Sequence, residues 1–194
     1  MTPKLIKLGV KTILKIICEK IIIRDILIVN KNDKIKGALD KLYIKAESIV
    51  FNKIYINNIF IKIKDIVLRF TFNKNFFIDN CHAVINIRLT KDNINKTLFS
   101  NKWRSLKSSI ESFISMSFQG IEISNESIYF ISFDELSYSK VAYTLHFDKN
   151  SISLVNNNNK EKLSIFNDKN INVKNLIFCE NYVELELSSK ITIN

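Results

Sequence analysis

Residue types suited to catalysis or metal binding are scarce and widely separated in this chain of 194 residues. The cysteines are Cys18, Cys81 and Cys179, and the histidines are His82 and His146. They include no CxxC pair and no set of four with the spacing of a zinc site. An odd number of distant cysteines also argues against a disulfide framework and fits a reducing compartment. The sequence therefore predicts no metal site and no cofactor.

The adjacent Cys81 and His82 suggest a nucleophile and its base. Neighbours on a strand point to opposite faces, however, so we expect a buried thiol beside a surface imidazole. No carboxylate pair and no triad centred on a histidine has an interpretable spacing. The three glycines are too far apart for a phosphate-binding loop. We therefore expect no enzymatic activity.

Lys and Arg number 29 against 19 Asp and Glu, which gives a formal net charge of +10. Ile, Lys, Asn and Phe are all abundant, which is the composition that AT-biased codons produce. The excess of basic residues is mostly Lys, whereas recognition of bases and phosphates relies on the two-pronged guanidinium of Arg. The charge thus supports weak attraction to any anionic surface. Nucleic-acid binding is one alternative, but Phe and Tyr mostly share the alternation of Ile, which places them inward. An inert structural module that assembles through exposed sheet edges is another.

Size and composition indicate one domain over residues 1–194. A chain of this length can bury about 70% of its unfolded surface, and 46% of its residues are hydrophobic. With only three glycines and one proline, the sequence has no linker-like segment.

Residues 1–19 form an expected basic amphipathic helix. At about 100° per residue, four lysines fall within a sector of about 80°. They are Lys4, Lys7, Lys11 and Lys15. The opposite side collects the apolar side chains Leu5, Ile6, Val10, Ile13, Ile16 and Ile17. We expect the apolar side of this helix to pack on the domain's own sheet, to dock on a membrane, or to do both.

The lysines interrupt the apolar run that a signal peptide requires, and Arg24–Asp25 splits the next run below the length of a membrane span. We therefore expect no signal peptide and no transmembrane helix. The expected location is cytoplasmic, or peripheral on the cytoplasmic face of a membrane.

From Leu42 onward the hydrophobic period changes from 3.6 to 2, which predicts strands over residues 20–194. The run Ile54–Phe72 alternates with one phase shift after Ile56 and another after Ile63. Fully extended it would span ~60 Å, so the shifts indicate bulges or bends that curve the sheet. Further strands are expected near residues 82–89, 121–133, 140–147, 151–155, 162–166 and 176–193.

Helical spacing returns after Thr90, an expected N-cap with Asp92 in the first turn. A second amphipathic helix is expected as an insertion near residues 101–118, because Trp103, Leu106 and Ile110 recur at helical spacing. The predicted fold class is α+β, with a long, curved antiparallel sheet wrapped around amphipathic helices.

Several motifs resemble the LmeA-like phospholipid-binding family. They are Gly37-x-Leu39-x-x-Leu42-x-Ile44-x-Ala46, Ile49-Val50-Phe51, Leu89-Thr90-x-Asp92-x-Ile94-Asn95-x-x-Leu98, and Val173-x-x-Leu176 through Val183-x-Leu185-x-Leu187. The similarity runs from about Lys20 to the end, and its last part is similar to the family's closing hairpin. It implies a fold related to tubular lipid-binding domains, in which a curved sheet wraps a long helix and leaves an apolar groove. It also implies phospholipid binding without catalysis.

An apolar sheet face is buried against the protein's own helices or against bound acyl chains. The pattern alone favours an ordinary core, and the resemblance favours acyl chains. The expected groove residues are Ile13, Ile17, Ile61, Ile63, Leu68, Phe70, Ile110 and Phe113. The candidates for a lipid headgroup or membrane surface are Lys4, Lys7, Lys11, Lys15, Lys102, Arg104 and Lys107. Asn95 matches the family motif, and we expect it to satisfy local backbone groups rather than to contact lipid.

Overall fold

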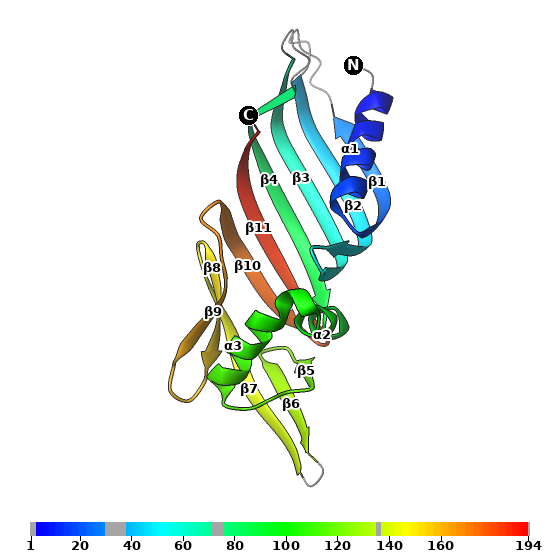
Figure 1. Ribbon diagram of the computed structural model, residues 1–194. Helices are drawn as coiled ribbons and strands as arrows, with labels where there is room; N and C mark the ends of the chain where they lie inside the picture. The colour runs from blue at the N-terminus through cyan, green and yellow to red at the C-terminus, as the bar shows by residue number, and fades with distance from the viewer. Residues whose placement is uncertain (1–2, 30–37, 71–75, 135–136, 194) are drawn as a thin grey trace.

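The structure is a computed structural model that describes residues 3–29, 38–70, 76–134 and 137–193, without the side chains of residues 38, 67–70, 76–80, 134 and 191–193. The described residues form an α+β fold with two antiparallel sheets and three α-helices. The first sheet has six strands in the order β1-β2-β3-β4-β11-β10. Their bounds are β1 Lys20–Val29, β2 Ala38–Phe51, β3 Ile54–Phe70, β4 Phe76–Thr90, β11 Tyr182–Ile193 and β10 Ile171–Cys179. Figure 1 shows that these strands are long and curve together.

Both phase shifts predicted in β3 are confirmed, and each occurs in step with β2. Ala46 pairs with Ile59 and Ile49 pairs with Ile56, so both strands carry one additional residue at the same level. Ser48 adopts a φ of 49° there. The same happens between the pairs Leu42–Ile63 and Leu39–Ile66, beside Asp65 with a φ of 56°. Because both strands shift together, the register is kept and the apolar side chains stay on one face while the backbone kinks.

The predicted N-terminal helix is α1, Pro3–Ile17, and it lies across one face of β1 and β2 (Figure 1). We call this face of the first sheet the inner face. Ile6, Val10 and Leu14 of α1 pack on it in one cluster with buried residues of the sheet. Those residues are Ile26, Leu39, Leu42, Ile44, Ile66 and Cys81. Among the helices of the described residues, none has the length and apolarity needed to span a membrane.

The expectation of a single sheet is wrong, because residues 120–167 form a second one. Its five strands follow chain order as β5 Gly120–Ile123, β6 Ile128–Asp134, β7 Ser137–Asp148, β8 Ser151–Asn156 and β9 Lys162–Asn167. The predicted strand over 121–133 is therefore two strands, joined by a tight turn in which the Ser124 amide donates to the Ser127 carbonyl. The stretch 176–193 likewise spans two strands, because it contains the end of β10 and all of β11. Alternation identifies strands but does not determine which ones pair.

Three helical segments connect the two sheets: α2 Lys91–Leu98, the 3-10 turn η1 Asn101–Trp103, and α3 Arg104–Ile114. They lie where the two sheets meet (Figure 1), so the first sheet does not wrap around its helices as expected. Thr90 is the N-cap of α2, as predicted, and it forms a reciprocal capping box with Asn93. Asn95 reaches further than expected: its Oδ1 accepts from the Ile121 amide at 2.9 Å, which ties α2 to β5.

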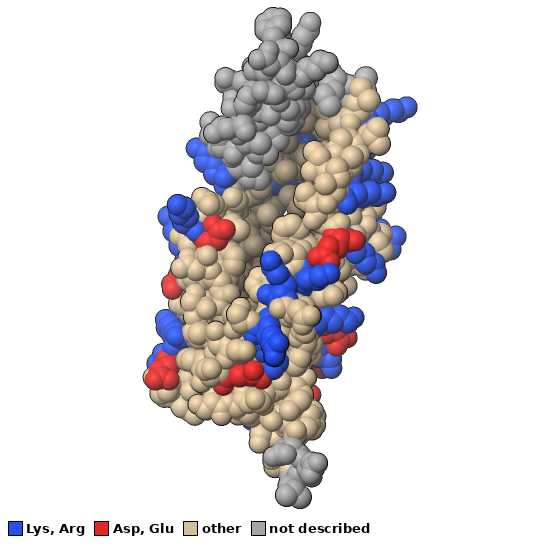
Figure 2. Space-filling model, viewed as in Figure 1, with Lys and Arg blue, Asp and Glu red and all other residues tan. Residues whose placement is uncertain are grey.

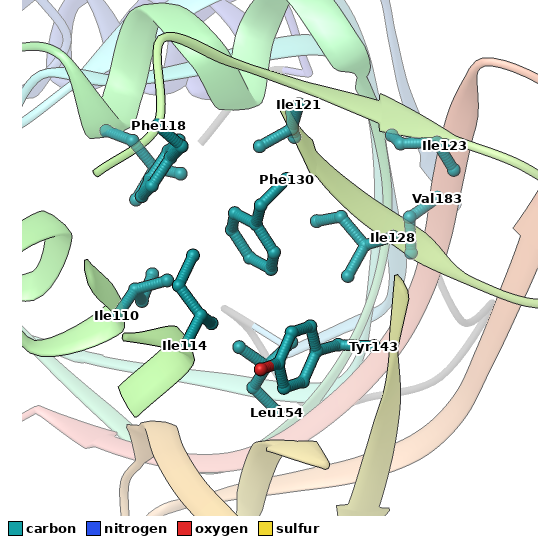
Figure 3. Packing of buried hydrophobic residues seen from close by; sticks show 11 residues of the cluster. Ile110, Ile114, Phe118, Ile121, Ile123, Ile128, Phe130, Tyr143, Leu154 and Val183 are labelled. Carbon is teal, nitrogen blue, oxygen red and sulfur yellow. The ribbon is translucent and has the colours of Figure 1, made fainter. Parts of the chain in front are cut away.

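The main core lies between α3, the second sheet and the start of β11 (Figure 3). Its centre is aromatic: the Phe130 ring lies 4.9 Å from Phe118 and 5.8 Å from Tyr143, both edge to face. Burial raises the pKa of Tyr143. Ile110, which stands on the inward side of α3, is also part of this cluster.

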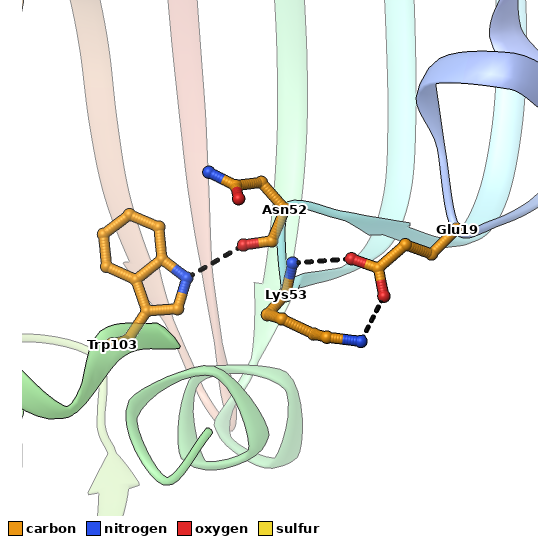
Figure 4. A network of polar contacts seen from close by, with 4 residues as sticks. All are labelled: Glu19, Asn52, Lys53 and Trp103. Atoms are coloured by element: carbon orange, nitrogen blue, oxygen red, sulfur yellow. Dashed lines mark hydrogen bonds and ion pairs between the residues drawn. The ribbon is translucent and has the colours of Figure 1, made fainter. Parts of the chain in front are cut away.

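The turn between β2 and β3 joins both helical regions to the first sheet (Figure 4). Asn52 and Lys53 both have positive φ, as a two-residue hairpin turn requires. The Lys53 amide donates to Glu19 Oε1 at 3.0 Å, and the Lys53 ammonium pairs with the same carboxylate. From the other side, Trp103 Nε1 donates to the Asn52 carbonyl at 3.1 Å. The end of α1 and the start of α3 are thus held at one end of the sheet.

Replacing Phe130 by Ala should lower the free energy of unfolding by about 3–5 kcal/mol, because the ring is almost fully buried and its removal leaves a cavity. Denaturant unfolding followed by circular dichroism measures this loss. Phe133→Ala is the matched control, since that side chain is 61% exposed and its loss should change the stability little. Equal losses in the two variants would contradict this description of the core.

Hydrogen bonds from Lys53 hold the pKa of the Glu19 carboxyl below its usual range. A lowered pKa in the folded state means that the interaction stabilises the fold above the unfolded pKa of about 4.3 and is lost as pH falls through the folded value. The melting temperature of the wild type should therefore fall on acidification below about pH 5. Glu19→Gln should show a shallower fall, whereas Glu126→Gln, at an exposed turn position, should follow the wild type. Parallel curves for all three proteins would refute a role for this carboxylate.

Candidate functional site

The inner face of the first sheet is wider than the elements that cover it. α1 covers β1, β2 and the adjoining part of β3, whereas β7, β8 and β9 cover β10, β11 and part of β4. Between these covers lies a strip of isoleucines from β3 and β4 that are only partly buried. They are Ile59, Ile61, Ile63, Ile85 and Ile87. Figure 2 shows a hollow on this side of the molecule. We call this strip the inner groove.

The strip separates the buried clusters of the inner face from one another. Ile61 and Ile63 pack toward the cluster under α1, and Ile85 and Ile87 pack toward the cluster under the second sheet. Ile59 and Ile87 also contact a third cluster, around Ile49 and Ile56. The side chains of the described residues thus leave the inner face only partly covered, so the groove offers apolar surface to a ligand.

The predicted groove residues fall in four places. Ile61 and Ile63 lie in the inner groove. Ile13 and Ile17 do not belong to the part of α1 that packs on the sheet and are more than half exposed. Ile110 and Phe113 belong to the main core, where Phe113 contacts Tyr143. Leu68 and Phe70 lie outside the residues whose side chains are described.

Ile59, Ile85 and Ile87 were not among the predicted groove residues. The alternation over residues 82–89 identifies Ile85 and Ile87 as one face of a strand, but it does not show that this strand pairs with β3. That pairing, Ile61 with Ile85 and Ile59 with Ile87, places them in the inner groove.

The predicted basic residues gather at two places. Lys4, Lys7, Lys11 and Lys15 follow one another along α1. Lys102 and Arg104 are exposed on either side of Trp103, whose indole contacts the same turn that holds Glu19, two residues after α1. The C-terminal end of α1 and the basic residues of η1 and α3 therefore converge on one end of the β2–β3 hairpin.

Lys107, a predicted residue for a lipid headgroup or membrane surface, is instead engaged in contacts within the protein. Its ammonium pairs with Glu111 and lies 5.0 Å from the centre of the Phe99 ring and 4.9 Å from that of Phe118. Ion-pair and cation–π contacts of this kind stabilise the packing of α3.

The opposite face of the first sheet, which we call the outer face, carries a polar trough of about 540 Å³ across its strands. Two ion pairs, Arg24 with Glu47 and Arg88 with Glu184, lie in it. They raise the pKa of each arginine and lower that of Glu47. The charged residues lining the trough balance one another, because three cations face three carboxylates. It therefore attracts neither anions nor cations strongly.

Two aromatic residues lie on the outer face rather than inward, which corrects the expectation for them. Tyr43 and Phe60 stack with their ring centres 6.0 Å apart. Lys62 lies over Tyr43 and Lys45 over Phe60. A basic and aromatic surface is therefore present on β2 and β3.

The structure separates the side chains of the adjacent Cys81 and His82. Cys81 is buried and His82 is exposed, so the two side chains lie on opposite faces as predicted. Burial raises the pKa of the Cys81 thiol, and the same holds for Cys18. No group of three or more His, Cys, Asp or Glu residues within the described part of the chain could hold a metal ion.

Comparisons with protein-family models, with curated proteins and with solved structures found no match to this chain. The function must therefore be inferred from the residues and geometry described above.

Proposed function

We propose that this protein is a non-catalytic phospholipid-binding protein that holds an acyl chain in the inner groove. The observation that carries the proposal is the strip of partly buried isoleucines between α1 and the second sheet. Apolar side chains on a sheet face are normally covered by the protein itself. A hydrocarbon chain is the ligand whose burial would complete this cover.

The dimensions of the groove suit one acyl chain. Ile63 lies four positions after Ile59 on β3, which corresponds to about 13 Å. The hydrocarbon of one bilayer leaflet is ~15 Å thick. Each buried methylene contributes about 0.8 kcal/mol, so ten of them would offset an association cost of several kcal/mol.

The headgroup would lie at the end of the sheet where basic residues converge. Lys102 and Arg104 flank Trp103, which contacts the β2–β3 turn, and Lys15 lies four positions before Glu19, which contacts the same turn. Figure 2 shows Lys and Arg side chains gathered midway along the face that carries the hollow. A phosphate ester placed there would be attracted by these cations.

The motifs that resemble the LmeA-like family support the same function. A fold related to tubular lipid-binding domains would explain why a curved sheet, a helix on its inner face and an apolar strip beside that helix occur together. In this proposal the first sheet and α1 form one lipid-holding half of such a fold.

The protein purified from cells should carry phospholipid that organic extraction and mass spectrometry detect at a near-stoichiometric level. Ile85→Glu places a carboxylate in the inner groove and should abolish this cargo, because a charge beside an acyl chain is costly to desolvate. Val84→Glu is the matched control, since its side chain points to the outer face, opposite Lys62, and it should retain the cargo. Melting temperatures check that both variants fold.

A wild-type protein free of lipid after gentle purification, and unable to take up a fluorescent phospholipid, would rule out the proposal. Equal loss of lipid in both folded variants would show that the inner groove is not the site.

Single-stranded nucleic-acid binding is the second candidate, favoured by Tyr43 and Phe60 lying among lysines on the outer face. Bases can stack on such rings, and binding would then weaken steeply with salt. An oligonucleotide gel shift at physiological salt, lost in Tyr43→Ala but kept in Tyr138→Ala, would support it. Because Lys45 and Lys62 already cover both rings, we expect no shift.

A further inference from the structure

The structure divides the surface of α1 into three sectors, where the sequence suggested two. Ile6, Val10 and Leu14 face the sheet. At about 100° per residue, the four lysines occupy the next sector of the helix. The remaining sector, about 140° wide, carries the apolar side chains Leu5, Leu8, Ile13 and Ile16. We call it the outward face of α1.

The outward face is far more exposed than apolar residues usually are. Ile16 is 76% exposed, Leu8 62%, Ile13 58% and Leu5 56%. Gly9 lies among them with open space around its Cα, so the face is flat at its centre. Four large aliphatic side chains on one helix face form a patch of the kind that marks an interaction site.

The charge of α1 indicates what kind of partner would cover this face. Lys4, Lys7, Lys11 and Lys15 run alongside it, and α1 contains no Asp or Glu. A second copy of α1 would bring four more lysines against these four, which is unfavourable. A bilayer with anionic lipids satisfies both features, because its acyl region accepts the aliphatic side chains while its headgroups attract the lysines.

We propose that the outward face of α1 docks on the surface of an anionic bilayer, with the helix axis parallel to the membrane plane. Leu8, Ile13 and Ile16 enter the boundary between headgroups and acyl chains, and the lysines contact lipid phosphates. Figure 2 shows uncharged surface between the hollow and the Lys and Arg side chains at the right-hand edge, beside α1. The docked helix therefore brings the inner groove next to the membrane. This inference goes beyond the proposed function, since α1 can dock whether or not the groove holds lipid.

Flotation with vesicles of phosphatidylcholine, alone or with 30 mol% phosphatidylglycerol, tests the proposal on the full chain. The wild type should float with the anionic vesicles and bind the neutral ones at least about tenfold more weakly, because each lysine near an anionic surface contributes about fivefold in affinity. The double variant Leu8→Gln with Ile16→Gln should lose at least about tenfold in affinity. Its control, Phe133→Gln with Ile177→Gln, removes two exposed apolar side chains elsewhere and should bind as the wild type does.

A second pair of variants separates the lysine row from net charge. Changing Lys4, Lys7, Lys11 and Lys15 to Gln should weaken binding at least about a hundredfold. Changing Lys160, Lys162, Lys169 and Lys174 to Gln lowers the net charge equally, at exposed positions distant from α1 in the sequence, and should have a small effect. Equal weakening in both quadruple variants would overturn the proposal.

Two further results would overturn it. One is a wild-type protein that stays at the bottom of the gradient with anionic vesicles. The other is a dimer, detected by light scattering, that dissociates in the Leu8→Gln, Ile16→Gln variant, because a second copy would then cover the outward face. Phospholipid extracted from the purified wild type distinguishes the two proposals. A wild type that carries lipid but does not float refutes docking alone, whereas one that floats without carrying lipid refutes the proposed function alone.

Discussion

A sheet with one apolar face must cover that face, and here the cover is narrower than the sheet. The six strands of the first sheet present a continuous row of isoleucine, leucine and valine on the inner face. α1 lies at one side and the second sheet at the other, so the described side chains leave the strip between them only partly covered. The inner groove follows from this difference in width. Only the hydrophobic effect would hold a ligand against this strip, because no described side chain in the strip carries a charge.

The β2–β3 turn determines where the two covers are anchored. Glu19 holds the end of α1 to Lys53, and Trp103 holds η1 to Asn52, so the two helical regions meet the sheet at adjacent residues of one turn. Both contacts engage the backbone of the turn and not only mobile side chains. These contacts fix where α1 and η1 meet the sheet at one end, and the packing of Ile6, Val10 and Leu14 fixes α1 along the border of the groove.

Local features were predictable from the sequence, and long-range pairing was not. Four lysines in one helical sector identified α1, Thr90 identified the start of α2, and the two phase shifts in β3 identified the kinks. Each of these signals is contained in a short stretch of sequence. The second sheet was missed because alternation in residues 121–166 is the same whether those strands extend the first sheet or form another. The same limit explains why Ile110 was expected in the groove, since helical spacing shows a buried side but not what lies against it.

The paired kinks of β2 and β3 couple the lengths of these strands. Ile59 faces inward because each strand carries one additional residue at the same place. These residues, Ser48 in β2 and Asn57 in β3, lie opposite each other and outside the regular pairing. Deleting Asn57 from β3 would make Ile54, Ile56 and Ile59 alternate regularly and would leave Ser48 of β2 without a pairing partner, so the paired kink would become a bulge in one strand. Deleting Ser48 as well would restore the one-to-one pairing and keep the isoleucines on the inner face, in a straighter hairpin. Changes of length at these two sites therefore preserve the pairing only when they occur together, which makes the hairpin, rather than either strand, the unit that can change in length.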